Sequence, residues 1–351
     1  SRLIPASIVK SDNRPLEMLT LGDSVVWGQG LKPENKFSHL VCEWLGKRTD
    51  RQVHFHNEAH SGATIYPETD NGAAFHGEIN VSSPSIFQQI KNSSEYYKNR
   101  NDSDGGKLAP ETVDLILIDG GINDTHATNI LFSTQQKISG KAKEYCYEGM
   151  SKLLSQTVKT YPNARIVVTG YFPLVSALSK ETEVLNVVLT VIKENKIQTV
   201  LSKFAKKLLD KTPDQFHFIH NALTTNSDMW YAESNRRLKQ SMDELNGKNK
   251  NPTFSATNPQ FLFVEVPFQP KNCYAVDETT FLWRIKAKTA TNDDIFEERE
   301  KICSIFKDNP FQEIVCRRAG AFHPNVNGAK AYATAIETKL EGILEKTTWK
   351  S

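Results

Sequence analysis

The stretch from Val113 to Ile118 constrains the fold of this chain more than any other part of the sequence. It reads Val-Asp-Leu-Ile-Leu-Ile and is apolar everywhere except at Asp114. Such a short and nearly continuous apolar run is typical of a strand that is buried on both faces of a parallel sheet. Because parallel strands are joined by crossover helices, the rest of the chain should alternate between strands and helices.

Four further strands and the helices between them fit this alternation. The other expected strands cover residues 16–21, 51–57, 165–170 and 261–266. The expected helices cover about residues 37–46, 84–97, 142–161 and 226–246, and a last helix begins near Pro324. The sequence therefore predicts an α/β protein with a five-stranded parallel sheet.

Two stretches exceed what such a unit requires, at about residues 174–222 and 267–318. The first contains an expected helical segment over residues 181–209, in which residues 184–192 are apolar almost all the way round. An ordinary buried helix explains this pattern. The alternative is a wall beside the acyl group of a substrate, and we predict that residues 184–192 contact that side. No internal repeat or linker divides the chain, so a single domain over residues 1–351 with two insertions is expected.

Charge and hydropathy limit the partners. The chain has 43 Lys and Arg residues against 41 Asp and Glu residues, a formal net charge of +2. Because no strong basic field would hold a polyanion, no nucleic-acid partner is expected. The apolar runs are too short to cross a bilayer, so no integral membrane segment is expected. We expect a monomer.

The five cysteines are Cys42, Cys146, Cys273, Cys303 and Cys316. They form no Cys-x-x-Cys pair, so a structural zinc site is not expected. The last three are close enough in sequence to supply one disulfide in an oxidising compartment, whereas buried or free thiols are the simpler interpretation. The compartment stays open, with an extracellular or secreted location slightly favoured over the cytoplasm.

Polar residues follow the expected strands. Ser24 follows the first strand, Gly62 the second and Asn123 the third, and His323 stands at the start of the last helix. The carboxyl ends of parallel strands meet at one edge of the sheet, where active sites are assembled. These residue types also supply what acyl transfer needs. Ser24 offers a hydroxyl nucleophile, His323 a base, and the main-chain N–H of Gly62 and the amide of Asn123 two oxyanion donors.

Four sequence blocks carry a family resemblance. They read Leu-Thr-Leu-Gly-Asp-Ser at residues 19–24, Ser-Gly-Ala-Thr at 61–64, Gly-Gly-Ile-Asn-Asp at 120–124 and Phe-His-Pro-Asn at 322–325. With these blocks the sequence resembles the SGNH hydrolases, also called GDSL esterases and lipases. The resemblance covers most of residues 16–345 and leaves the two insertions unmatched. It implies a three-layer α/β/α sandwich of the flavodoxin-like type.

The same resemblance implies a reaction and a set of residue roles. Ser24 would be the nucleophile and His323 the base. The N–H of Ser24, Gly62 and Asn123 would form the oxyanion hole. The implied activity is cleavage of carboxylic esters, with a lipid, sugar or other small-molecule ester as substrate, through an acyl-enzyme intermediate. No cofactor and no metal are implied.

One departure from the family pattern concerns the acid that orients the histidine. The family's last block usually reads Asp-x-x-His, but Gly320 stands three residues before His323. We predict a Ser-His dyad whose imidazole is oriented by a main-chain carbonyl, that of Gly320. The nearest acidic residues upstream, Asp308 and Glu313, are expected to be dispensable for this purpose.

Other functions remain open from the sequence. The same site could transfer the acyl group to an alcohol other than water. The missing acid at residue 320 also allows a ligand-binding protein that has lost turnover. His54, His56 and His60 could suggest a metal centre, but no Cys or Asp nearby completes one.

Overall fold

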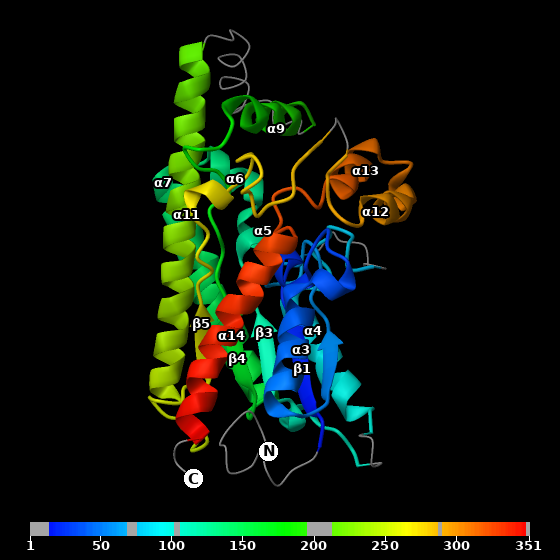
Figure 1. The fold of residues 1–351 in the computed structure, drawn as a ribbon, viewed down its shortest axis with the longest axis vertical. Helices are drawn as coiled ribbons and strands as arrows, with labels where there is room; N and C mark the ends of the chain where they lie inside the picture. The colour runs from blue at the N-terminus through cyan, green and yellow to red at the C-terminus, as the bar shows by residue number, and fades with distance from the viewer. Residues whose placement is uncertain (1–13, 69–75, 102–105, 195–212, 287–289, 349–351) are drawn as a thin grey trace.

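The computed structural model describes residues 14–68, 76–101, 106–194, 213–286 and 290–348. Its centre is a five-stranded parallel sheet in the order β2-β1-β3-β4-β5 (Figure 1). The strands are β1 (Leu16–Leu21), β2 (Val53–Asn57), β3 (Leu115–Ile118), β4 (Arg165–Thr169) and β5 (Phe261–Val264). The predicted fold class is confirmed, and the strand boundaries differ from the predicted ones by at most two residues.

Helices cover both faces of the sheet. α3 (Phe37–Thr49) and α14 (Val326–Thr348) pack side by side on one face, while α4 (Ile86–Lys98), α8 (Met150–Thr160) and α11 (Pro213–Lys248) cover the other (Figure 1). The described part of the chain is therefore a three-layer α/β/α sandwich. The shorter helices are α2 (Ser24–Trp27), α5 (Ile122–Thr125), α6 (Ala127–Phe132), α7 (Gln135–Lys141), α9 (Glu181–Glu194), α12 (Phe296–Cys303) and α13 (Pro310–Arg317).

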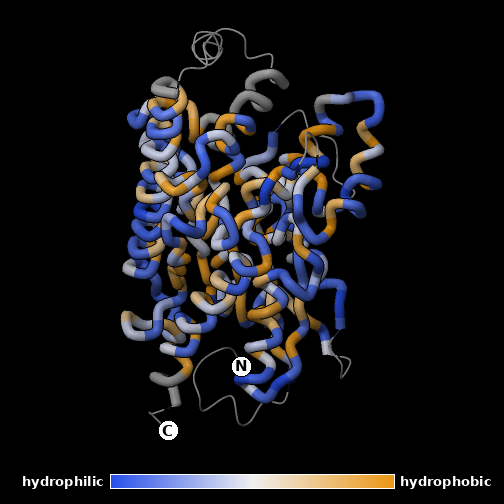
Figure 2. Tube along the Cα trace, turned by 45° about the horizontal axis from the view of Figure 1, so that its top comes forward, coloured by the Kyte–Doolittle hydropathy of each residue, from blue (hydrophilic) through white to orange (hydrophobic). Residues whose placement is uncertain are grey.

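The sheet lies in the middle of the hydrophobic core. Every residue of β1, β3 and β4 is buried. Apolar segments gather in the interior, and polar ones lie along the outer helices (Figure 2). This burial on both faces explains why residues 113–118 read as an almost unbroken apolar run.

Four predicted helical segments differ in their bounds from the observed ones. The helix predicted over residues 226–246 is the longer α11, and the one over 142–161 starts as a π-helix at Ala142–Gly149 before it continues as α8. The last helix begins at Val326, because Pro324 forms an isolated bridge with Leu282 instead. Of the segment predicted over residues 181–209, α9 ends at Glu194, and residues 195–212 lie outside the described part.

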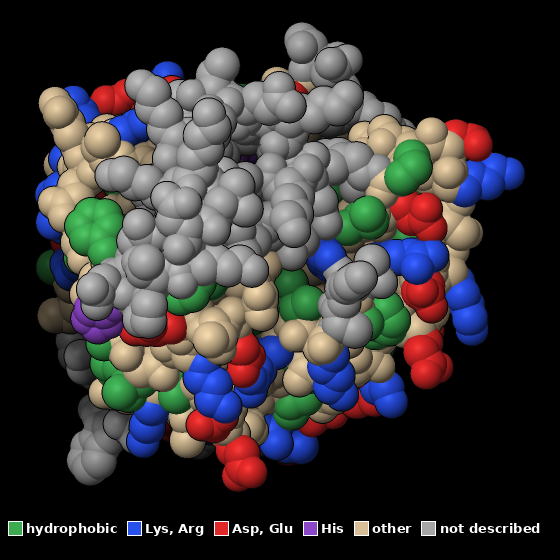
Figure 3. Space-filling model, turned by 90° about the horizontal axis from the view of Figure 1, so that it is seen from above, with side chains coloured by type: hydrophobic (Ala, Val, Ile, Leu, Met, Phe, Trp, Pro, Cys, Tyr) green, Lys and Arg blue, Asp and Glu red, His purple; other side chains and the backbone are tan. Residues whose placement is uncertain are grey.

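Loops at the carboxyl ends of the strands form one end of the molecule. α5, α9, α12 and α13 all lie at this end (Figure 1). Seen from above, its described part carries basic and acidic side chains interspersed around the rim (Figure 3). None of the helices in the described ranges combines the length and the apolar character that a membrane crossing would need.

Candidate active site

The nucleophile turn, which we define as residues 22–24, joins β1 to α2. Gly22 has a positive φ of 138°, a conformation that favours glycine. Gln89 of α4 holds this residue twice: its Oε1 accepts from the Gly22 N–H at 2.8 Å, and its amide donates to the Gly22 carbonyl at 3.0 Å. A buried side chain from a neighbouring helix thus replaces the backbone partners that the strand no longer supplies.

Two buried acids, one in the turn and one at the end of β3, make hydrogen bonds that hold it. The side chain of Asp23 accepts from the Val25 N–H at 2.8 Å and from the Tyr171 hydroxyl at 2.9 Å. Asp119, which follows β3, accepts from the Asp23 N–H at 2.8 Å. Burial raises the pKa of both acids. Ser24 therefore lies next to a layer of buried polar side chains and is itself only 4% exposed.

His323 contacts the hydroxyl of Ser24 directly. Its Nε2 lies 2.7 Å from Ser24 Oγ, and its Nδ1 lies 3.1 Å from the main-chain oxygen of Ala321. Because a carbonyl oxygen can only accept, Nδ1 carries the ring proton, and Nε2 is left to accept from the serine hydroxyl. This is the tautomer that a general base needs.

Gly320 was predicted to supply the orienting carbonyl, and this role stays a prediction. The carbonyl within hydrogen-bond distance of Nδ1 is that of Ala321, and the main chain of Gly320 contributes less to raising the pKa of His323. The Gly320 carbonyl accepts from the main-chain N–H of His323 at 3.2 Å, closing a tight turn. Phe322 has a positive φ of 64°, and this conformation directs the Ala321 carbonyl toward the ring. A main-chain carbonyl does contact the imidazole, but it belongs to the next residue along the chain.

Burial also sets the protonation state of the imidazole. Desolvation lowers the pKa of His323 to about 4, and the acceptor Ala321 opposes this only in part. The ring is therefore neutral at pH 7, which leaves its Nε2 lone pair free to take a proton.

The two other predicted residues lie at the same edge of the sheet. The segment around Gly62 is tied to the nucleophile turn by a bond from the His60 N–H to the Gly22 carbonyl at 3.1 Å. Asn123, at the start of α5, reaches back to this segment and donates one amide hydrogen to the Ala63 carbonyl at 3.0 Å. Its amide has a second hydrogen to offer. These contacts bring the three loops together, and the oxyanion roles stay predictions.

Gly62 is confined by its surroundings. It has a φ of 82°, and an added Cβ would lie 2.3 Å from Oδ1 of Asn80 and 2.7 Å from the N of Val81. No side chain could be accommodated without moving the backbone. Glycine is therefore required at this position.

The apolar stretch over residues 184–192 belongs to α9. Val184 and Leu185 are part of the hydrophobic core, and α9 packs against α11. The side chains of residues 188–192 lie outside what the structure describes. Contact between this stretch and an acyl group therefore stays a prediction.

The three early histidines have separate partners. His54 lies 2.9 Å from Glu17, and His56 lies 2.9 Å from Glu58. His60 contacts main-chain oxygens of its own loop. In the described ranges, no three His, Cys, Asp or Glu side chains are placed to share a metal ion.

The late cysteines include one disulfide. Cys303 at the end of α12 is bonded to Cys316 in α13, so the two short helices of the second insertion are joined covalently. Cys273 is a buried thiol, as is Cys146, and Cys42 is also free. The disulfide was one of the two alternatives that the sequence left open.

Sequence reasoning missed several residues around the dyad. Gln89 and Tyr171 are examples, and Asp293 with Arg299 of α12 is another. Gln89 and Tyr171 contact the nucleophile turn over long separations along the chain, so nothing in the local sequence singles them out. Asp293 and Arg299 are only six positions apart, but their burial cannot be read from the sequence.

The known proteins that this chain resembles were found among solved structures. No family model matches the chain, and no curated protein is similar to it at a significant level. Similar solved structures include a phospholipase A1 from Streptomyces albidoflavus, with 13% identity, a TM-score of 0.46, and coverage of 93% of this chain and 99% of that one. An extracellular lipase from Streptomyces rimosus has 14% identity, a TM-score of 0.44, and coverage of 92% and 99%.

A third similar structure is a carbohydrate esterase family 2 enzyme with a carbohydrate-binding domain from Corynascus thermopiles. It has 14% identity, a TM-score of 0.43, and coverage of 95% of this chain and 68% of that one. The names of these three proteins are those of a phospholipase, a lipase and a carbohydrate esterase.

Proposed function

We propose that this protein is a carboxylic ester hydrolase that forms an acyl-enzyme on Ser24. The observation that carries the proposal is the contact of 2.7 Å between Ser24 Oγ and His323 Nε2, with Nδ1 held by the Ala321 carbonyl. A hydroxyl, a neutral imidazole and an acceptor behind it, in line, are the arrangement that activates a serine.

The reaction follows from this geometry. Ser24 Oγ attacks the ester carbonyl while its proton passes to Nε2 of His323. The oxyanion is met by the N–H groups of Ser24 and Gly62 and by the amide of Asn123. His323 then returns the proton to the departing alkoxide, which leaves as an alcohol. A water molecule attacks the acyl-enzyme by the same route and releases the carboxylic acid.

A series of p-nitrophenyl esters from acetate to palmitate tests the activity and its chain-length preference. The wild-type protein should release p-nitrophenolate, and Ser24→Ala should not. A fluorophosphonate probe should label the wild-type protein at Ser24, as peptide mass spectrometry would show. A folded wild-type protein that neither hydrolyses any of these esters nor reacts with the probe would favour a binding protein instead.

Asn123 offers an independent test of the oxyanion hole. Replacing it with Ala removes one amide donor and should lower kcat by about 10²–10³-fold. Asn123 also donates to Ala63, so the thermal stability of the variant must be measured alongside. A loss of kcat with an unchanged Tm supports the assigned role.

The disulfide bears on the compartment. Disulfides persist in oxidising surroundings and are rare in the reducing cytosol. The Cys303–Cys316 bond therefore supports a secreted or otherwise oxidising location. Thiol labelling of the protein in its native host, before and after reduction, would test this directly.

A further inference from the structure

The space next to Gly320 is filled by a carboxylate from elsewhere in the chain. A Cβ built on Gly320 would lie 2.4 Å from Oδ2 of Asp293 and 2.9 Å from its Cγ. A side chain at residue 320 would therefore start where the Asp293 carboxylate already lies. The two residues are adjacent in space although 27 positions apart in the sequence.

Asp293 is fully paired inside the protein. Arg299 approaches it with both terminal nitrogens: Nη1 donates to Oδ1 at 2.9 Å, and Nη2 donates to Oδ2. Thr291 donates its hydroxyl to Oδ2 as well. The side chains of Asp293 and Arg299 are both wholly buried. Buried charges of this kind persist only when paired, so the two residues act as one unit.

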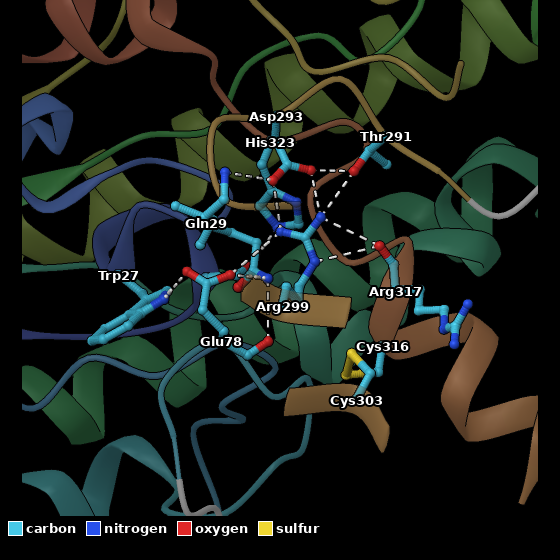
Figure 4. A network of polar contacts seen from close by, with 12 residues as sticks. Trp27, Gln29, Glu78, Thr291, Asp293, Arg299, Cys303, Cys316, Arg317 and His323 are labelled. Carbon is cyan, nitrogen blue, oxygen red and sulfur yellow. Dashed lines mark hydrogen bonds and ion pairs between the residues drawn. A yellow bond between two sulfur atoms is a disulfide. The ribbon is translucent and has the colours of Figure 1, made fainter. Parts of the chain in front are cut away.

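Arg299 extends this unit to the histidine turn, which we define as residues 317–323. Its Nε and Nη2 both donate to the carbonyl of Arg317 at 3.3 Å. The turn therefore has two contacts with the ion pair. The Arg317 carbonyl binds Arg299 (Figure 4), and Gly320 lies against Asp293. The carbonyl that contacts His323 Nδ1 belongs to Ala321, the residue after Gly320 in this same turn.

The same unit reaches the helix that carries the nucleophile. Arg299 Nη1 lies 3.5 Å from the carboxylate of Glu78. Glu78 in turn accepts from the indole N–H of Trp27 at 2.8 Å and from the amide of Gln29 at 2.7 Å. Trp27 is the last residue of α2, which starts at Ser24. A chain of buried polar contacts thus links α2 to the histidine turn (Figure 4).

We propose that Asp293 is a positioning residue for His323, which acts through Arg299 and the main chain of the histidine turn. Its carboxylate occupies the space that an acid at residue 320 would fill. It does not contact the imidazole, but it holds the turn whose Ala321 carbonyl does. This inference rests on the proposed function for its kinetic consequences. Its structural content, the orientation of the ring, can be measured without activity.

The charges near His323 give the inference a signature. Arg299 disfavours the imidazolium, Asp293 favours it, and Glu78 lies behind Arg299. In the wild-type protein the effects of Arg299 and Asp293 on the pKa of His323 therefore have opposite signs. Arg299→Gln leaves the Asp293 carboxylate without its cation, so the acid limb of the pH profile of kcat/KM should move to higher pH. A role limited to folding would lower the amount of active protein without moving this limb.

The first experiment compares Asp293→Asn with the wild-type protein, using the ester that the wild type hydrolyses best. Because a small misplacement of the base is costly, kcat should fall by about 10²-fold. KM should stay within about twofold, since no substrate contact is removed. Circular dichroism and Tm establish that the variant is folded. A folded Asp293→Asn with kcat within threefold of the wild-type value would overturn the inference.

The second experiment moves the carboxylate, in case Asp293→Asn does not fold. Asp293→Gly alone removes the acid, and Asp293→Gly with Gly320→Asp returns an acid to the same space from the histidine turn. The double variant should regain at least tenfold in kcat over the single one. A folded double variant no better than Asp293→Gly would contradict the inference.

An NMR measurement separates failure of the inference from failure of the proposed function. In the wild-type protein, the His323 Nδ1–H that is bound to Ala321 should give a protected downfield proton signal. This signal should be lost or exchange rapidly in Asp293→Asn and return in the relocated variant. If the wild type hydrolyses no ester, the proposed function fails, and this signal still decides the inference. An unchanged signal in folded Asp293→Asn would overturn it.

Discussion

The nucleophile turn and the histidine turn share one feature and differ in another. In each, a glycine lies against a buried carboxyl group: Gly22 against Asp119, where an added Cβ would lie 2.1 Å from Oδ1, and Gly320 against Asp293. Asp119 accepts from the main-chain N–H of Asp23, and no cation contacts it in the part of the chain that the structure describes. Asp293 is paired with the guanidinium of Arg299.

The difference lies in which part of the chain holds each turn. The nucleophile turn is held by the sheet and by α4. Both belong to the hydrophobic core of the sandwich. The histidine turn is held by the second insertion, through an ion pair and a disulfide between α12 and α13. Disturbance of the insertion should therefore affect the histidine half of the dyad more than the serine half, which the insertion reaches only through Glu78 and the end of α2.

The largest effect is expected from removing either half of the dyad itself. Ser24→Ala and His323→Ala should each lower kcat by about 10⁴–10⁶-fold, because the two residues act as a unit. Steady-state kinetics on a p-nitrophenyl ester would measure this loss. Circular dichroism should show both variants folded.

Two acidic residues near the histidine in sequence provide the control. Asp308 is exposed, and Glu313 pairs with Arg317 at 2.8 Å. Asp308→Asn and Glu313→Gln should retain most of the activity. A thousandfold loss in either folded variant would mean that a different carboxylate completes the site.

The next largest effect is expected from a substitution in the nucleophile turn. Gly22→Ala combines a φ of 138° with a Cβ 2.1 Å from Asp119. Strain and overpacking together should lower the free energy of unfolding by about 4 kcal/mol. Urea denaturation followed by circular dichroism measures this. A variant of wild-type stability would show that the turn is more adaptable than its contacts indicate.

A smaller effect is expected on the histidine side from opening the disulfide. The bond closes a loop with a sequence separation of 13, so its removal should lower the free energy of unfolding by about 3 kcal/mol at most. The double variant Cys303→Ser with Cys316→Ser should also lose severalfold in kcat, because α12 carries Arg299. Cys273→Ser, a buried thiol outside the disulfide, is the matched control. Equal kcat in the two variants would show that the disulfide does not help to hold the histidine turn.

The smallest effect concerns pH. The pKa of His323 is lowered to about 4 by burial, and the base must be neutral to accept the serine proton. As pH falls from 8 to 5 the ring stays neutral, so kcat/KM should change by less than about twofold over this range. Below about pH 4 it should fall tenfold per pH unit. A midpoint near pH 6.5 would mean that the imidazole is more hydrated than the structure indicates.

Much of the fold could be predicted from the sequence because its central strands are buried on both faces. Residues 113–118 and 165–170 read as strands without ambiguity for this reason. Helix lengths were less accessible. The helix predicted from residue 226 begins at Pro213, because its earlier turns are stabilised by packing on α6, α7 and α9, and such tertiary contacts leave little trace in local periodicity.

The site was predictable as far as it depends on residues that follow strands. Ser24 and His323 were singled out by their positions, and they are in contact. The carbonyl within hydrogen-bond distance of His323 Nδ1 was not predictable, because the choice between Gly320 and Ala321 depends on the φ of Phe322. Asp293 escaped for another reason: the sequence was searched for an acid close to the histidine, whereas the acid that fills this space comes from a distant loop.

The long helix α11 bears on how the protein unfolds. At about 1.5 Å per residue, its 36 residues extend well beyond any strand of the sheet. Its C-terminal part is fastened to the sandwich, with Ser241 bonded to Ser151 of α8 and Asn246 to Phe261 of β5. Its N-terminal part stands beyond the sheet beside α9 (Figure 1). Amide hydrogen exchange should therefore be graded along this one helix: slow near Met242, where opening requires global unfolding, and fast near Phe218, where fraying suffices.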